Sequence, residues 1–259
     1  MNRDWDRVLA ETDDWTGRPW ADLVCDSINK FTTGDGIFLT LGPGMVGTEA
    51  WVVSDRCPKM KILGFEPQTD RYNFLKDKFP GELTNAAVAS HDGTVQGWMG
   101  HRDGKSDFWL NASPENQQHY LQQQVDTVTV DSILEPFPRT PVVLWMDIEG
   151  AELEALRGAI LSLLSGQFWF ISIELNFVAE DNSHCYWAHI VELLRRMGYI
   201  ASASSSKCNV KTNEINEQYV SLVETTGHTD VLFTLRKGNF PRNYLSAHLV
   251  EYNGELENK

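Results

Sequence analysis

Apolar residues occur along this chain in short, unbroken runs that polar loops separate. The clearest run is Val142–Met146, which stops abruptly at Asp147 and Glu149. Such a run, without polar alternation, is typical of a strand in a parallel sheet that helices cover on both faces. Similar runs predict strands at residues 36–41, 61–65, 85–90, 168–173, 199–203 and 230–236. An alternating pattern predicts a more exposed strand at residues 125–130.

Apolar residues at helical spacing follow most of these strands. The best example runs from residue 151 to residue 165, and Gly166 is placed to end it in a left-handed conformation. Its predicted inner face is Leu153, Leu156, Ile160, Leu163 and Leu164. Other helices are predicted at residues 3–12, 20–31, 69–79 and 186–197, around residues 50–53, and from residue 131. Alternating strands and helices indicate an α/β fold built on a parallel sheet.

No linker or internal repeat divides the chain. We therefore predict one main domain with a helical cap before it and a tail after it, at residues 36–240, 1–35 and 241–259 respectively. An Asp92-Gly93 turn is predicted to make a hairpin with the strand at 85–90.

Two segments have the composition to cover a ligand. The polar, glutamine-rich stretch at residues 100–123 is either a substrate lid or a surface loop. Three tryptophans in the N-terminal cap either anchor its helices on the domain or close over a ligand; they are Trp5, Trp15 and Trp20.

Charge and composition limit the classes of molecule that we expect this protein to bind. The 259 residues include 22 Lys and Arg against 36 Asp and Glu, a formal net charge of −14. A field of this sign repels phosphate backbones, so we predict no nucleic-acid partner. Because we find neither an apolar signal segment nor a membrane-spanning run, we expect a cytoplasmic protein without membrane contact. Four scattered cysteines are expected to be reduced thiols.

A glycine loop lies between the first predicted strand and the next helix. It contains Gly42, Gly44 and Gly47. Glycines let a backbone approach a ligand closely, and the N-terminus of the following helix favours an anionic group. Glu66 ends the second strand roughly twenty residues later, the spacing at which an acid meets the ribose hydroxyls of a nucleotide cofactor. Glu66 could instead cap the next helix, and we favour the ligand role.

Acidic residues end two further strands of the predicted sheet. Asp147 and Glu149 follow one apolar run, and Glu174 follows the next. In open parallel sheets, ligands bind beyond the carboxyl ends of the strands. These three residues are therefore candidate catalytic groups, with Asp147 the best placed to act as a base. Acids in a first helical turn also stabilise a helix, and for Glu152 we prefer that structural role.

Three stretches, in order, resemble the FkbM family of class I S-adenosylmethionine-dependent methyltransferases. They are Phe65-Glu66-Pro67, Asn85-Ala86-Ala87-Val88 with the Asp92-Gly93 turn, and Val128-Thr129-Val130-Asp131 leading to Met146-Asp147-Ile148-Glu149-Gly150-Ala151-Glu152. Asp230, which opens the last predicted strand, is similar to the family pattern as well. The resemblance covers about residues 36–236.

This resemblance implies a Rossmann-like fold. Its expected sheet has seven mostly parallel strands with an antiparallel last strand, and helices on both faces. The resemblance also implies S-adenosylmethionine as cofactor and methyl transfer to an oxygen of a small molecule or sugar, either a hydroxyl or a carboxyl. With the reasoning above, the predicted cofactor-binding residues are Gly42, Gly44, Gly47, Glu49, Glu66, Pro67, Ala86, Ala87 and Asp147.

The glycine loop departs from the family pattern. The family has an aspartate at the strand end followed by glycine, alanine and asparagine, whereas this chain has Thr40-Leu41-Gly42-Pro43-Gly44, and Gly47 comes one position late. Glu49 could replace the missing contact to the amino group of the cofactor, or it could be a surface acid of the helix.

Three other functions compete with this prediction. In a metal-dependent, catechol-type O-methyltransferase, Asp147, Glu174 and Asn176 would hold a divalent cation; we predict instead that no metal is needed. The altered glycine loop favours a protein that binds the cofactor without catalysis. A nicotinamide oxidoreductase would use the glycine loop and Glu66, but it leaves the block from Asp147 to Glu152 unexplained.

Overall fold

The computed structural model describes residues 17–44, 46–102, 105–109, 121–176, 187–206, 209–211 and 228–235. The helices are α2 (Gly17–Phe31), α3 (Thr48–Arg56), α4 (Thr69–Leu75), α6 (Val130–Leu134), α7 (Glu152–Arg157), α8 (Ile160–Leu164) and α9 (Trp187–Arg196). The main sheet contains β1 (Gly36–Leu41), β2 (Met60–Phe65), β3 (Glu82–Thr84), β8 (Val142–Met146), β9 (Phe168–Asn176), β10 (Tyr199–Ser206), β11 (Asn209–Lys211) and β12 (His228–Leu235). A second sheet contains β4 (Ala87–Val88), β5 (Gly93–Arg102), β6 (Lys105–Trp109) and β7 (Leu121–Val128).

The main sheet confirms the predicted fold class. Its strand order is β11-β10-β12-β9-β8-β1-β2-β3, and the strands from β9 to β3 are parallel to one another. Strand β12 is antiparallel to both of its neighbours, as expected for the late strand. The three-residue strand β11 adds an edge that the sequence did not predict.

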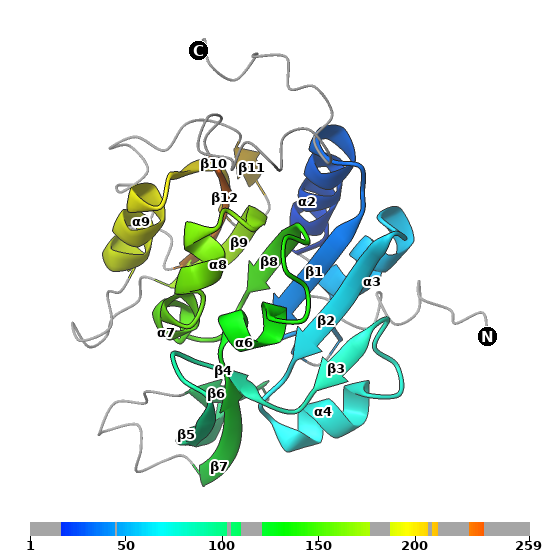
Figure 1. The fold of residues 1–259 in the computed structure, drawn as a ribbon. Helices are drawn as coiled ribbons and strands as arrows, with labels where there is room; N and C mark the ends of the chain where they lie inside the picture. The colour runs from blue at the N-terminus through cyan, green and yellow to red at the C-terminus, as the bar shows by residue number, and fades with distance from the viewer. Residues whose placement is uncertain are drawn as a thin grey trace.

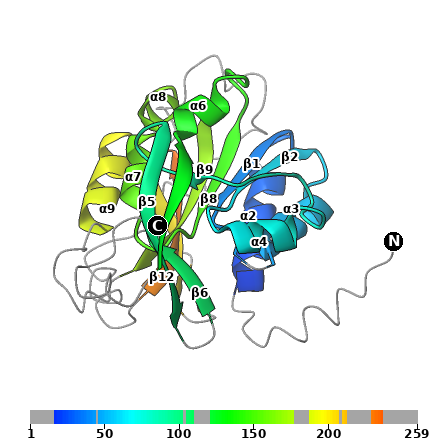
Figure 2. The same cartoon turned by 90° about the horizontal axis from the view of Figure 1, so that it is seen from below.

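Helices cover both faces of the main sheet (Figures 1 and 2). Alternate residues of β1 and β8 point to opposite faces, so Phe38 and Val143 pack in one core cluster with residues of α2 and α3, while Leu39 and Leu144 pack in another with residues of α6 to α9. The central strands are buried on both faces for this reason, which explains their unbroken apolar runs.

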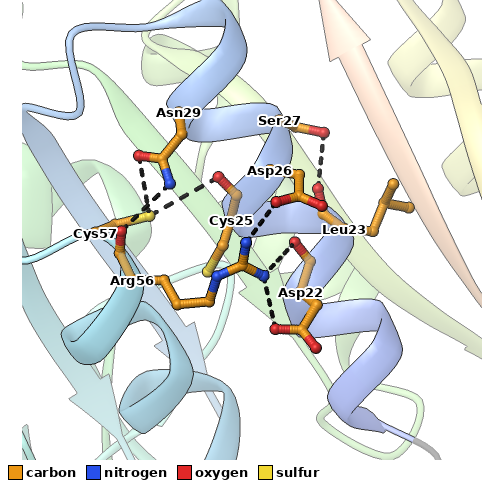
Figure 3. Close-up of polar contacts among 8 residues, drawn as sticks. All are labelled: Asp22, Leu23, Cys25, Asp26, Ser27, Asn29, Arg56 and Cys57. Carbon is orange, nitrogen blue, oxygen red and sulfur yellow. Dashed lines mark hydrogen bonds and ion pairs between the residues drawn. The ribbon is translucent and has the colours of Figure 1, made fainter.

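Helix α2 is anchored on the sheet and on α3. Trp20 is fully buried, and its indole Nε1–H donates to the Ser172 hydroxyl on β9 at 2.8 Å. Arg56, at the end of α3, pairs with Asp22 at 2.7 Å and with Asp26 at 2.5 Å (Figure 3). Trp20 therefore has the anchoring role that was one of the two expectations for the N-terminal tryptophans.

The buried thiols of Cys25 and Cys57 also lie at the contact between α2 and α3 (Figure 3). Both are free, and Cys57 Sγ lies 3.9 Å from the Cys25 carbonyl oxygen. They pack as small apolar groups between the two helices.

The strand predicted at residues 85–90 forms only as the two-residue strand β4, and it lies in the second sheet. The third parallel strand is β3, at residues 82–84, which lies at the edge of the main sheet with its side chains largely exposed, so it lacks an apolar run. The apolar residues after it are buried because the chain crosses there into the second sheet, where β4 pairs with β7.

The predicted hairpin at Asp92-Gly93 is wrong, because β7 lies between β4 and β5. Asp92 instead accepts hydrogen bonds from the Thr129 amide and the Ser132 hydroxyl, both at 2.6 Å, and so holds the start of α6. The stretch at 100–123 contains the end of β5, all of β6 and the start of β7; residues 110–120 lie outside the described residues.

The predicted helix at 151–165 is divided into α7 and α8. Gly158 lies at the break, where a Cβ atom would be 2.2 Å from the Ala89 carbonyl oxygen. The Asp131 carboxylate accepts from the amides of Leu161 and Ser162 at 2.9 and 2.8 Å, and thus caps α8 as a separate helix. The break rotates Leu164 outward, to 65% exposure.

Several predictions fall on residues that the structure does not describe, among them the helix at 3–12, Trp5, Trp15 and the tail at 241–259. Among the helices that are described, none is long and apolar enough to cross a membrane.

Candidate active site

The glycine loop is held between the ends of three parallel strands. Gly42 has φ 75°, and a Cβ atom there would be 2.1 Å from the Asp147 carbonyl oxygen, so a side chain does not fit. The Gly42 amide donates to the Phe65 carbonyl at 2.9 Å, and the Asp147 amide donates to the Leu41 carbonyl at 3.1 Å. These bonds bring the loop after β1 next to the loop after β8.

The other two glycines of the loop have different surroundings. Gly44 has φ 63°, and nothing lies within 4 Å of the position of its Cβ, so this part of the loop borders open space. Gly47 has φ 60° and is the N-cap of α3, and as a glycine it has no side chain that could cap the helix. Together they leave an open backbone turn at the start of a nine-residue helix, which suits an anionic group.

Glu66 lies next to this turn, and only 1% of its surface is exposed to solvent. Its carboxylate accepts from the Gln68 amide at 2.9 Å and also from the Gly44 amide. Burial raises its pKa to about 7, although both hydrogen bonds and the charge of Arg71 act in the opposite direction. The structure thus brings Glu66 and Gly44 together, and Glu66 also holds the glycine loop.

The residues after β3 form a wall beside Glu66. The Asn85 amide group donates to the carbonyls of Glu66 at 2.8 Å and of Pro67 at 3.1 Å. Ala86 and Ala87 follow, and both are small and buried. The second sheet is tied to the same wall, because Gln123 of β7 donates to the hydroxyl of Thr69 at 3.1 Å.

Three carboxyl groups come together at the ends of β8, β9 and β12. The β8–β9 register pairs Met146 with Ile173, so Asp147 and Glu174 come next on the two strands, and the β9–β12 register places Glu174 opposite Asp230. The Asp147 and Glu174 side chains are hydrogen bonded to each other. Because two adjacent ionised carboxylates repel each other, this contact favours the protonated form of one of the two groups.

Crowding raises the pKa of all three carboxyl groups. The pKa of Glu174 is raised to about 8, mainly by desolvation and next by the charge of Asp230. The pKa of Asp230 is raised to about 7, mainly by desolvation and next by the charge of Asp147. Asp147 is solvent-exposed, and desolvation, then the charge of Glu174, raises its pKa well above its ordinary value. The exposed surface lets a ligand reach Asp147, and the contact with Glu174 supports the direction of the shift.

Sequence reasoning missed Asp230 as a site residue. Its only signal was its place at the start of the last predicted strand, because the pairing of that strand with β9 is not visible in the sequence.

Three further acids surround this group. Glu49 is half-buried, accepts from the buried Thr40 hydroxyl at 2.8 Å, and has a pKa that burial raises to about 7, so it is not a surface acid. Glu149 has φ 54°, unusual for a residue other than glycine, and its charge acts on Glu174. Glu152 accepts from two loop amides, Ile148 at 3.2 Å and Gly150 at 3.3 Å, which confirms its predicted structural role.

The described residues give no support to the metal-dependent alternative. Within them, no group of three or more His, Cys, Asp or Glu side chains is arranged to hold a metal ion. The Asn176 side chain lies outside the described part of the chain.

Sequence comparison assigns the family. The methyltransferase FkbM domain matches residues 45–201, more than half of the chain. The chain belongs to the FkbM methyltransferase family. It is therefore an S-adenosylmethionine-dependent methyltransferase, as predicted from its motifs. Among curated proteins, no match was found.

Solved structures similar to this FkbM methyltransferase share little of its sequence. A TehB-like S-adenosylmethionine-dependent methyltransferase from Corynebacterium glutamicum has a TM-score of 0.46 and 14% identity over 90% of this chain and 94% of its own. Precorrin-6y C5,15-methyltransferase from Geobacter metallireducens has a TM-score of 0.44 and 10% identity over 87% and 91%. The plantazolicin methyltransferase in complex with S-adenosylhomocysteine has a TM-score of 0.40 and 10% identity over 85% and 82%.

The raised pKa values predict a pH dependence of stability. Because the folded FkbM enzyme binds protons at Glu66, Glu174 and Asp230 more tightly than the unfolded chain, the stability they contribute is complete below about pH 4 and is lost as the pH rises through about 7 to 8. We expect the free energy of unfolding in urea, without cofactor, to fall between about pH 5 and about pH 8.

A pair of variants isolates the acids that cause this fall. Glu174→Gln should flatten the profile, whereas Asp55→Asn, at an exposed position on α3, should leave it unchanged. Stability that rises with pH over the same window would contradict the assignment of protonated carboxyl groups.

Proposed function

We propose that this enzyme transfers the methyl group of S-adenosylmethionine to an oxygen of a small molecule or a sugar, either a hydroxyl or a carboxyl. The observation that carries the proposal is the position of Asp147 and Glu174, which lie next to each other on β8 and β9 and beside the glycine loop. The donor would supply an activated methyl group on a sulfonium. The task of the protein is then to align the acceptor in line with that methyl group and to remove a proton from a hydroxyl acceptor.

The residues of the glycine loop fit the methionine part of the donor. The open turn at Gly44 and the N-terminus of α3, which begins at a glycine N-cap, would receive its carboxylate. Gly42 and Gly47 shape that turn, because each has positive φ. Glu49, which points toward the acidic group and not to the outer surface, would accept from its ammonium group.

The wall after β2 and β3 fits the nucleoside part. Glu66 would accept from the ribose hydroxyls, sharing its carboxylate with the Gly44 amide that it already binds. Pro67 is held next to it by Asn85, and the small, buried residues Ala86 and Ala87 would border the adenine.

The Asp147–Glu174 pair has the protonation properties of a general base near neutral pH. An ordinary aspartate is a weak base because its pKa is far below 7, whereas burial raises the pKa of Asp147 well above its ordinary value and the pKa of Glu174 to about 8. The hydroxyl proton of the acceptor would pass to the carboxylate of Asp147, and Glu174 would stabilise the result through the hydrogen bond between them. Glu149 lies close enough for its charge to act on the pair and would face the acceptor.

The departure of the glycine loop from the family pattern does not favour an inactive protein. Gly42, Gly44 and Gly47 all adopt left-handed conformations, and the loop is bonded to its neighbours on both sides. Thr40 is the first residue at which the glycine loop differs from the family pattern. Its hydroxyl donates a hydrogen bond that holds the Glu49 carboxylate inward.

Removal of the Glu66 carboxylate tests the cofactor site. Glu66→Ala should weaken S-adenosylmethionine binding by about 1.5–3 kcal/mol, roughly 10- to 150-fold in Kd, because it removes hydrogen bonds to a charged group. Isothermal titration calorimetry gives the affinity.

The control for this variant is Glu82→Ala, the same change at an exposed position on β3. Because Glu66 also holds the glycine loop, the thermal stability of both variants is measured alongside binding. Equal affinity of wild type and Glu66→Ala would remove Glu66 from the cofactor site.

A screen of acceptors with methyl-labelled S-adenosylmethionine tests the reaction. We expect labelled products that are ethers or esters, and base hydrolysis separates the two because only esters are cleaved. Activity should persist in EDTA, since the pair of carboxyl groups removes the proton without a metal. Complete loss in EDTA with recovery on adding Mg²⁺ would favour the metal-dependent mechanism, and products methylated on nitrogen would contradict oxygen transfer.

A further inference from the structure

The Asp147–Glu174 pair extends through the sheet to a third carboxyl group. Glu174 and Asp230 are directly opposite each other on the antiparallel strands β9 and β12, so their side chains lie on the same face of the sheet. Asp147 is hydrogen bonded to Glu174 at the end of the neighbouring strand β8. The three residues, which we call the carboxyl row, therefore lie side by side on three adjacent strands, where their charges act on one another.

The carboxyl row lies beside the loop that would hold the donor. The backbone amide of Asp147 is bonded to the Leu41 carbonyl, and the Asp147 carbonyl fills the space where a side chain of Gly42 would be. A positive charge on a ligand in the glycine loop would thus approach the carboxyl row from the side of Asp147.

The charged groups that act on the carboxyl row are themselves acids. Glu49 from α3, Glu149 from the loop after β8 and Glu152 from α7 all disfavour further ionisation of the row. On the remaining side, β10 places Ser205 opposite Asp230 in the strand register. Protons are held in the row because these negative charges face one another, and a cation placed among them would favour their release.

We propose that the carboxyl row of Asp147, Glu174 and Asp230 releases a proton when the cationic methyl donor binds, so that the site distinguishes S-adenosylmethionine from S-adenosylhomocysteine by charge. This inference rests on the proposed cofactor site. The sulfonium of S-adenosylmethionine is permanently positive, whereas the thioether of S-adenosylhomocysteine is neutral, and the two ligands otherwise share their charged and polar groups. Donor binding would then leave Asp147 ionised, and the row would regain its proton from the acceptor hydroxyl as the methyl group is transferred. The neutral product would no longer favour the ionised row and would leave the site.

Calorimetry with the two ligands tests this inference without an acceptor. Titrations at about pH 7 in buffers of different ionisation enthalpy give the number of protons exchanged on binding. We expect S-adenosylmethionine to release about 0.3 to about 1 proton more than S-adenosylhomocysteine, because groups that titrate near the working pH are partly protonated.

Variants of the carboxyl row assign the proton. Glu174→Gln should reduce the difference between the ligands to less than about half of the wild-type value, because the row has lost one of its carboxyl groups. Asp230→Asn should reduce it as well, and it should weaken S-adenosylmethionine more than S-adenosylhomocysteine, by about 3- to 10-fold, because one charge of a partly solvated site is lost. Asp55→Asn, which removes the same charge on the outside of α3, should keep the wild-type difference.

The possible outcomes separate this inference from the proposed function. Equal proton release for the two ligands in the wild-type enzyme would overturn the inference and leave the cofactor site intact. A wild-type difference that survives in both Glu174→Gln and Asp230→Asn would also overturn it, because other groups would then supply the proton. Failure of both ligands to bind would overturn the proposed cofactor site, and the inference with it.

Discussion

The close contact between Gly42 and the backbone of Asp147 is the constraint on which the site depends. A side chain at position 42 would overlap the Asp147 carbonyl oxygen, so the loops after β1 and β8 can meet only at a glycine in a left-handed conformation. This contact sets the glycine loop beside the acidic strand ends. The donor loop and the candidate base therefore belong to one backbone arrangement, although about a hundred residues separate them along the chain.

The same arrangement concentrates negative charge at the carboxyl edge of the sheet. Burial of several carboxyl groups at one edge disfavours their ionised forms and raises the pKa of each. The rest of the fold stabilises the strand ends that carry these groups: apolar cores cover both faces of the sheet, and α2 is fixed by Trp20 and by the ion pairs of Arg56. A site of this kind matches a ligand that is itself positively charged.

The sequence was sufficient for the central part of the fold. Strands with both faces buried carry unbroken apolar runs, so β1, β2, β8 and β9 were predicted close to their observed bounds. The edge strand β3 escaped prediction because its exposed residues have no apolar run. The break between α7 and α8 also escaped, because it depends on contacts of Gly158 and Asp131 with distant segments.

The residues of the candidate site also divide into those that the sequence predicted and those that it did not. Asp147, Glu174 and the glycines were found because each follows a buried strand directly in the sequence. Asp230 and the inward position of Glu49 were not, since the first depends on the pairing of β12 with β9 and the second on a hydrogen bond from Thr40. Residues brought in by strand order or by a side-chain contact have no local pattern that identifies them.

The central claim is that the carboxyl pair removes the proton of the acceptor, and the turnover of Asp147→Asn tests it most directly. Asparagine has nearly the shape of aspartate but cannot accept a proton, so thermal stability and the affinity for the neutral S-adenosylhomocysteine should stay near wild type. Turnover with an acceptor found by the screen should fall by about 10²- to 10⁴-fold, as is typical when a general base is lost. Turnover at the wild-type rate would contradict the claim.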